Sequence, residues 1–181
     1  MMEGSAGPKP TTVSERPKLP GGGWMSGKRI TAAVPEPLVY ALNPRYPGDL
    51  RAFYNEAIPL MRDDLIQAMR EAGVDNLEIF RAVLKDPFAK KDLTNYKSVN
   101  IVGVVSCADA AKSARMGTSD SNLVDADYAA LNIDENKAGG LLCFRLAEAV
   151  NAVVVHAKVK QSIEAKNLPG VEFFGPGEWS G

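Results

Sequence analysis

MRDDLIQAMREAGVDNLEIF at residues 61–80 and VHAKVKQSIEAKNLPGVEFF at residues 155–174 carry one pattern twice. Without a gap, six large apolar positions of the first stretch meet apolar positions of the second. The aligned pairs are Leu65 and Val159, Met69 and Ile163, Val74 and Leu168, Leu77 and Val171, Ile79 and Phe173, and Phe80 and Phe174. Each stretch predicts a short amphipathic helix, a stop and a short apolar strand. The chain therefore shows a possible internal repeat of a helix–strand unit, and whether the copies share an origin stays open.

The two stops in this pattern are chemically equivalent. In the first copy, apolar side chains recur at helical spacing over residues 61–72, and Gly73 follows. In the second copy, we expect a helix over Ala157–Lys166, and Asn167 follows. Glycine and then asparagine best tolerate the left-handed conformation that closes a helix. Both helices are therefore predicted to end at these residues.

The other apolar stretches predict strands. The strongest is Tyr96–Ser106, which is apolar on both faces and is therefore typical of a central strand. The remaining expected strands are Arg29–Val34, Leu38–Leu42, Leu77–Leu84, Leu141–Ala147, Ala152–His156 and Val171–Phe174. Asp49–Glu56 favours one or two turns of helix. Several short strands with few helices indicate an α+β fold with a short mixed or antiparallel sheet.

The composition indicates one globular domain. The chain has 181 residues and is 45% hydrophobic, which is enough for one core. Residues 1–23 contain Pro, Gly, Ser and Thr with almost no large apolar side chain, so we expect a flexible tail with its hinge at residues 21–23. The domain is predicted to span residues 24–181.

Charge and hydropathy argue against several classes of partner. The formal net charge is −1, so no overall basic field would attract nucleic acid or anionic lipid. No apolar run approaches the roughly 20 residues of a membrane span, and the first residues lack the apolar core of a secretory signal. We therefore expect a cytoplasmic protein that binds neither nucleic acid nor membrane.

Catalytic and metal-binding chemistry has little support in the sequence. His156 is the single histidine, and no phosphate-binding glycine motif is present, so no metal or other cofactor is expected. Cys107 and Cys143 lie in apolar stretches, which favours buried reduced thiols over a disulfide. A catalytic dyad of either thiol with His156 is the enzyme alternative. A hydrogen-bonded structural imidazole is the commoner role at that position.

One acidic stretch stands above this background. Residues 118–136 contain five acids and neither Lys nor Arg. The acids are Asp120, Asp125, Asp127, Asp134 and Glu135. A solvated loop would explain them, and so would a negative patch that meets a basic partner, where it would speed association. These five residues are the candidate partner-binding site.

Several motifs resemble a bacterial immunity-protein family whose members are encoded beside polymorphic toxins. The resemblance lies in FRLAE at Phe144–Glu148, NAVVV at Asn151–Val155 and LPGVEF at Leu168–Phe173. YKSVN at Tyr96–Asn100 and ADAAKS at Ala108–Ser113 also match, and residues 40–50 are similar to a version common in myxobacteria. The match begins near Trp24 and runs to the last residue, and its motifs are structural.

The resemblance implies an inhibitor that binds a cognate secreted toxin and neutralises it. Such toxins, including those delivered by type VI secretion, often carry nuclease domains, whose basic clefts would suit the acidic stretch. The motif residues are expected in the core rather than at the interface, with Phe144, Val154, Val159, Ile163 and Phe173 buried. A non-inhibitory adaptor and a small cysteine enzyme remain the alternatives, and the oligomeric state is open.

Overall fold

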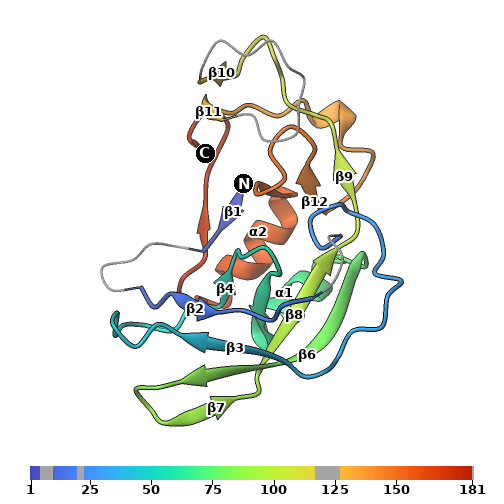
Figure 1. Cartoon of the computed structure of the whole chain (residues 1–181). Coiled ribbons are helices and arrows are strands. Elements are labelled where there is room, and N and C mark those ends of the chain that lie inside the picture. Colours follow the sequence, from blue (N-terminus) through green and yellow to red (C-terminus); the bar gives the residue numbers. More distant parts are fainter. Residues whose placement is uncertain (5–9, 20–22, 117–126, 181) are drawn as a thin grey trace.

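The structure, a computed structural model, describes residues 1–4, 10–19, 23–116 and 127–180, and its fold is mixed α+β (Figure 1). The helical elements of these residues are α1 (Asp63–Glu71), α2 (Ala157–Glu164) and the short 3₁₀ helix η1 (Glu135–Lys137). The strands are β1 (Met2–Glu3), β2 (Val13–Glu15), β3 (Leu38–Leu42), β4 (Phe53–Tyr54), β5 (Leu60–Arg62), β6 (Leu77–Asp86), β7 (Lys91–Leu93), β8 (Tyr96–Ile101), β9 (Val104–Val105), β10 (Ala114–Arg115), β11 (Tyr128–Ala130), β12 (Cys143–Leu146), β13 (Val153–Val155) and β14 (Glu172–Phe173). Strands therefore dominate, as the sequence predicts.

The first copy of the pattern lies in a β-α-β unit whose two strands are separated by a third. Strands β5 and β6 are joined through α1, and both run antiparallel to β8, which lies between them. Strand β4 pairs with the outer edge of β5. We name β4, β5, α1, β6 and β8 the first unit.

The second copy has the same connectivity. Strands β13 and β14 are joined through α2, and both run antiparallel to β1, which lies between them. Strand β12 pairs with the outer edge of β13, as β4 does with β5. We name β12, β13, α2, β14 and β1 the second unit. The two units thus differ chiefly in the origin of the middle strand.

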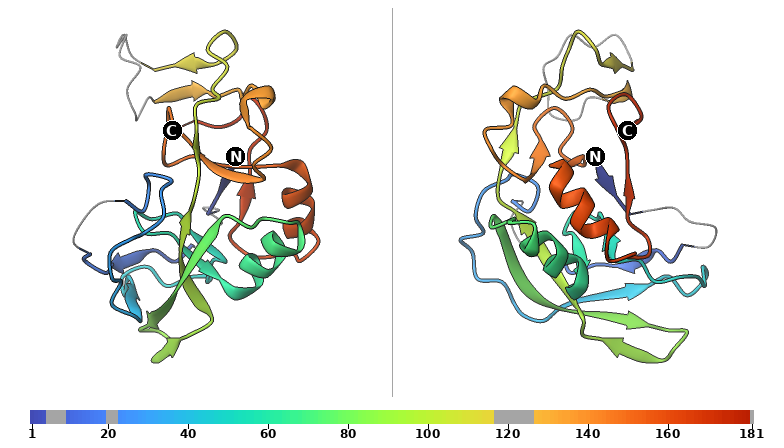
Figure 2. Two further views of the ribbon diagram at one scale, coloured as in Figure 1. Left: turned by 90° about the vertical axis from the view of Figure 1, so that its right-hand side faces the viewer. Right: turned by 180° about the vertical axis from the view of Figure 1, so that it is seen from behind.

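The two helices lie side by side between the sheets of the two units (Figures 1 and 2). The hydroxyl of Ser162 donates to the backbone oxygen of Ala68 over 2.8 Å, and these residues occupy aligned positions of the two copies. The Lys166 ammonium pairs with the Glu71 carboxylate at 2.8 Å. The packing of the helices therefore brings equivalent positions together.

One shared core and two outer cores follow from this arrangement. The first five aligned pairs of the pattern lie in or against one cluster between the units, which also contains Met2 and Val153. The last pair separates. Phe80 packs against a cluster that contains Trp24, with the two rings 5.0 Å apart, whereas Phe174 packs against a cluster that contains Trp179. Each sheet therefore covers the shared core with one face and its own core with the other.

The helix stops behave as predicted. Gly73 has a φ of 95° and Asn167 a φ of 49°, so both lie in the left-handed region. The predicted strands at Leu38–Leu42, Leu77–Leu84, Ala152–His156 and Val171–Phe174 are confirmed with small changes of boundary. Of the expected core residues, Phe144, Val159 and Ile163 are buried, while Val154 and Phe173 are only half-buried.

The strongest predicted strand is in fact two strands. Tyr96–Ile101 forms β8, the central strand of the first unit, and Val104–Val105 forms β9, which pairs in parallel with β12 of the second unit. Gly103 separates them with a φ of 135°, which favours glycine. The left view of Figure 2 shows the chain running from one sheet to the other at this point.

The prediction of a flexible tail over residues 1–23 is wrong where the structure describes them. Strand β1 lies inside a sheet with Met2 fully buried, and β2 pairs with β3 and buries Val13. These strands are too short to show a periodic pattern in the sequence. Each is held in its sheet by the burial of a single side chain. Residues 21 and 22 of the expected hinge lie outside the described residues.

Two local predictions near the first unit are also wrong. Arg29–Val34 forms no strand, because the backbone N–H of Ile30 donates to the Glu78 carboxylate over 2.9 Å instead of to a neighbouring strand. Asp49–Glu56 forms no helix, because Phe53 and Tyr54 pair with β5 as β4. The Tyr54 hydroxyl is buried and lies 2.6 Å from that of Thr11, which fixes the edge strand.

Candidate interaction surface

The acidic stretch is only partly described, because Asp120 and Asp125 lie outside the described residues. Asp127 and Glu135 are exposed. Asp134 instead begins η1, where its carboxylate accepts the N–H of Asn136 over 3.2 Å. The same carboxylate lies 3.6 Å from the ammonium of Lys137. Asp134 therefore has a structural role, and a partner could meet Asp127 and Glu135 more directly.

Cationic residues from outside the stretch lie close to it. Strand β10 pairs with β11, and the Arg115 guanidinium lies 6.0 Å from the centre of the Tyr128 ring. Tyr128 directly follows Asp127 in the sequence, so this cation lies near the acidic stretch. Lys112 forms an ion pair with Asp109 at 3.0 Å. The backbone N–H of Asp109 donates to the backbone oxygen of Asn132, which brings this turn next to the acidic stretch. The folded surface here is therefore less uniformly negative than the sequence indicates.

The cysteine–histidine alternative receives no support from the geometry. Both cysteines are buried free thiols. Burial raises the pKa of the Cys107 thiol to about 11 and that of the Cys143 thiol to about 12, so both stay protonated near neutral pH. His156 is exposed, and its Nδ1 accepts the backbone N–H of Lys158 over 3.2 Å at the start of α2. The imidazole is thus a helix cap, the structural role expected of it.

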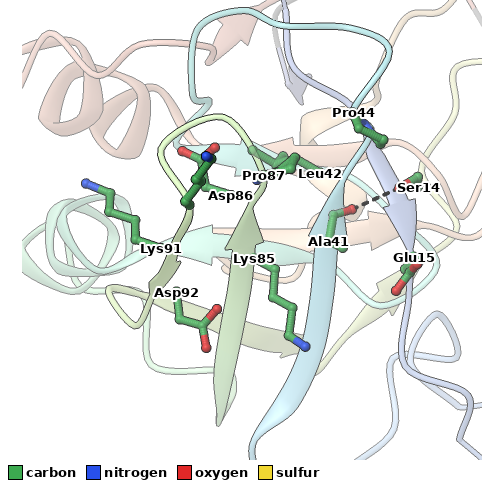
Figure 3. A pocket seen from close by; sticks show the side chains of 11 residues that line it. Ser14, Glu15, Ala41, Leu42, Pro44, Lys85, Asp86, Pro87, Lys91 and Asp92 are labelled. Atoms are coloured by element: carbon green, nitrogen blue, oxygen red, sulfur yellow. Dashed lines mark hydrogen bonds between the residues drawn. The ribbon is translucent and has the colours of Figure 1, made fainter.

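A shallow groove is lined by residues of β2, β3, β6 and β7 and of the loops beside them (Figure 3). These strands lie at the opposite end of the molecule from β10 and β11 (Figure 1). The groove is open to solvent, has a volume of about 660 Å³ and is lined chiefly by charged side chains and prolines. The lining includes Glu15, Pro44, Lys85, Pro87, Lys91 and Asp92. The Ser14 hydroxyl donates to the oxygen of Ala41 across its floor over 3.4 Å.

Two exposed aromatic residues lie close in the sequence to residues that line this groove. Tyr46 is 58% exposed and Phe88, at the tip of the β6–β7 hairpin, is 42% exposed. The Asp86 carboxylate accepts the N–H groups of Phe88 and Ala89 over 2.9 and 3.0 Å, which fixes the tip. Aromatic residues are enriched at protein-binding surfaces, whereas Lys, Glu and Asp are depleted there. Sequence reasoning missed this surface, and the only signal was an aromatic residue just after each of Asn43-Pro44 and Asp86-Pro87.

Of the motifs in the family resemblance, FRLAE and YKSVN are largely buried, whereas LPGVEF and ADAAKS are half-buried or exposed. In FRLAE, Phe144 and Leu146 belong to the outer core of the second unit, and Arg145 is fully buried on β12. Burial lowers the pKa of Arg145 to about 10, and its guanidinium donates to the oxygen of Val150 over 2.6 Å. In LPGVEF, Gly170 has a φ of 68°, and a side chain there would approach the Cβ of Arg51 to 2.6 Å. These residues therefore contribute to packing within and beside the second unit.

Neither a metal-binding cluster, nor a membrane-spanning helix, nor a related protein assigns a function to the described residues. Within the described ranges, no three His, Cys, Asp or Glu side chains are grouped closely enough to hold a metal ion. No described helix combines the length and the apolar character needed to cross a membrane. Comparison of the sequence with protein-family models and with curated proteins finds no match.

Proposed function

We propose that this protein is an immunity protein that binds a cognate secreted toxin and neutralises it by protein–protein contact in the cytoplasm. A nuclease toxin, of the kind delivered by type VI secretion among other routes, is the target class that the resemblance favours. The proposal requires a rigid scaffold with variable surface, because immunity proteins must distinguish closely related toxins.

The observation that carries the proposal is the burial of the first three residues of the FRLAE motif. Phe144, Arg145 and Leu146 are buried, and Gly170 is packed against Arg51. A binding protein can keep such a scaffold while its exposed residues change. The two thiols of the enzyme alternative are, in contrast, held protonated in the core.

The scaffold itself supports a further part of this proposal. The two units share connectivity, the chemistry of their helix stops and a contact between the aligned residues Ala68 and Ser162. We therefore regard them as repeats of one β-α-β element. Their surroundings differ, since β6 of the first unit contributes to the groove, whereas the second unit lies nearer the acidic stretch (Figure 1).

The direct test uses the product of the neighbouring gene. The purified full chain is mixed with that product, the complex is isolated, and the activity of the neighbour is titrated against added protein. We expect a one-to-one complex in which the activity disappears. A complex that leaves the activity intact would favour the adaptor alternative, and no complex would contradict the immunity proposal.

The place of the interface is tested by charge reversal. Asp127→Lys with Glu135→Lys changes two exposed carboxylates, and we expect association with a basic toxin to slow by about tenfold at low salt and to become less salt-dependent. The measurement is the association rate at several salt concentrations. Glu15→Lys with Asp92→Lys is the matched control, with the same change of charge in the groove at the other end. A slower rate only in the control would move the interface to the groove.

A further inference from the structure

The middle strand of the second unit fills a slot between two strands. In β1, Met2 pairs with Val153 on one side and with Phe173 on the other, and Glu3 pairs with Glu172. Among the described residues, β14 has no other strand neighbour. The slot therefore offers backbone hydrogen-bonding groups from both sides, which is the requirement for adding a strand.

The side chains of residues 1–3 also have their own sites in the slot. The Met2 side chain is fully buried in the shared core, whereas Met1 packs against the outer core of the second unit. The Glu3 carboxylate accepts the indole N–H of Trp179. At the start of the strand, the Met1 nitrogen donates to the oxygen of Phe174 over 2.6 Å, and the Phe174 N–H donates back over 2.9 Å.

The middle strand of the first unit is longer and more completely buried than β1. Strand β8 occupies the corresponding place and is Tyr96–Ile101, with five of its six side chains buried. It continues directly into β9 at one end and follows β7 closely at the other. Strand β1 is two residues long, and Met2 is its one fully buried side chain. Its slot is formed by residues far away in the sequence.

We propose that the slot between β13 and β14 is a peptide-binding site, which residues 1–4 occupy in cis. Its ligand is a short extended peptide with a long apolar side chain that enters the shared core, followed by a carboxylate that meets Trp179. Backbone pairing supplies affinity, and these two side chains supply selectivity. The site goes beyond the proposed immunity function and does not rest on it.

Tethering makes residues 1–4 a strong competitor for the slot. A segment joined by a short linker is present at an effective concentration of the order of millimolar, so an added peptide binds the unchanged chain weakly. A full-length chain with a weakened cis strand should bind the peptide better. Met2→Ala removes the buried side chain, and Glu3→Ala removes the contact with Trp179 while it keeps Met2.

The experiment measures binding of a labelled peptide Met-Met-Glu-Gly to three full-length chains by fluorescence anisotropy. We expect the Met2→Ala chain to bind at least about tenfold more tightly than the unchanged chain, and the peptide to raise its Tm. The control peptide Met-Asp-Glu-Gly should not bind. If the Met2→Ala chain does not unfold cooperatively, the Glu3→Ala chain takes its place.

Two results would overturn the proposal. One is a folded variant that binds the peptide no better than the unchanged chain, and the other is equal binding of the two peptides. Size-exclusion chromatography of the variant mixed with the unchanged chain adds a further outcome. A dimer that the Met-Met-Glu-Gly peptide dissociates would support the site, because residues 1–4 of the second copy would then occupy the slot.

Discussion

The two units have the same connectivity and differ in how the middle strand is held. In the first unit, β8 is a continuous internal strand whose side chains fill cores on both faces. In the second unit, β1 contributes one fully buried side chain, Met2, and its backbone pairs span one or two residues on each side. The comparison teaches that equal connectivity does not imply equal stability. The second unit should be the weaker of the two.

The largest expected effect comes from placing a carboxylate on each middle strand. Val99→Asp buries an unpaired charge in the shared core, so we expect a loss of more than about 4 kcal/mol and no cooperative unfolding transition. Met2→Asp should cost about 2–4 kcal/mol, because β1 can leave the sheet while the first unit stays folded. Amide hydrogen exchange at Val99 and Ile101 in the Met2→Asp chain measures whether the first unit stays folded. Loss of exchange protection at these two amides would contradict the claim that the second unit can open while the first stays folded.

A second comparison concerns two phenylalanines of the second unit. Phe144 is 2% exposed, so Phe144→Ala should lower the free energy of unfolding by about 3–5 kcal/mol. Phe173 is half-buried with its ring 5.8 Å from the Lys160 ammonium, so Phe173→Ala should cost roughly half as much. Urea denaturation of both variants supplies the values. Equal losses would show that the edge strand is packed as tightly as β12.

The helix stops give a smaller and more selective effect. Gly73→Ala should cost about 1–2 kcal/mol, because alanine is strained at a φ of 95° although the nearest side-chain atom leaves room for it. Asn167→Gly should change stability by less than about 0.5 kcal/mol, since either residue adopts a φ of 49°. Thermal unfolding of the two variants compares them. A large loss for Asn167→Gly would indicate that the asparagine has a further role.

The smallest effect is a dependence on alkaline pH. Burial raises the pKa of the Cys143 thiol to about 12 from an ordinary value of 9.0, so the folded chain keeps a proton that the unfolded chain has lost. This contribution to stability is present below pH 9 and is lost as the pH rises towards 12. Between pH 9 and pH 11, the free energy of unfolding of Cys143→Ala should therefore fall less steeply than that of the unchanged chain. Identical slopes in denaturation at each pH would contradict this.

Local pattern was enough to predict the helices and several strands. The stripe that contains Leu65 and Met69 and the stop at Gly73 determine α1 without any distant contact, and the same holds for Ile163 and Asn167 in α2. Tyr96–Ser106 was predicted as one strand because its apolar pattern is continuous. Gly103 divides this stretch into β8 and β9, and the division follows from the pairing of β9 with the second sheet, which the local pattern does not show.

The contacts that sequence reasoning missed join distant residues. Met2 is buried only because β13 and β14 form later in the chain, and no window around residues 1–4 contains that information. Ile30 is held by the Glu78 side chain, which cannot be read from the apolar run at Arg29–Val34. In the candidate site, Asp134 remains a predicted partner-binding residue, and sequence reasoning missed that its carboxylate also caps η1. The groove was missed because its residues come from β2, β3, β6 and β7.

The position of β1 also determines the order in which the chain can fold during synthesis on the ribosome. The first unit spans residues 53–101, so all of its strands can pair before β12, β13 and β14 of the second unit are translated. The hydrogen bonds between Met1 and Phe174 join residues 173 positions apart, so the second unit must wait until translation has passed its last strand. Nascent chains of this protein therefore emerge with the first unit assembled and with Met2 still exposed, within reach of any chaperone that binds apolar segments.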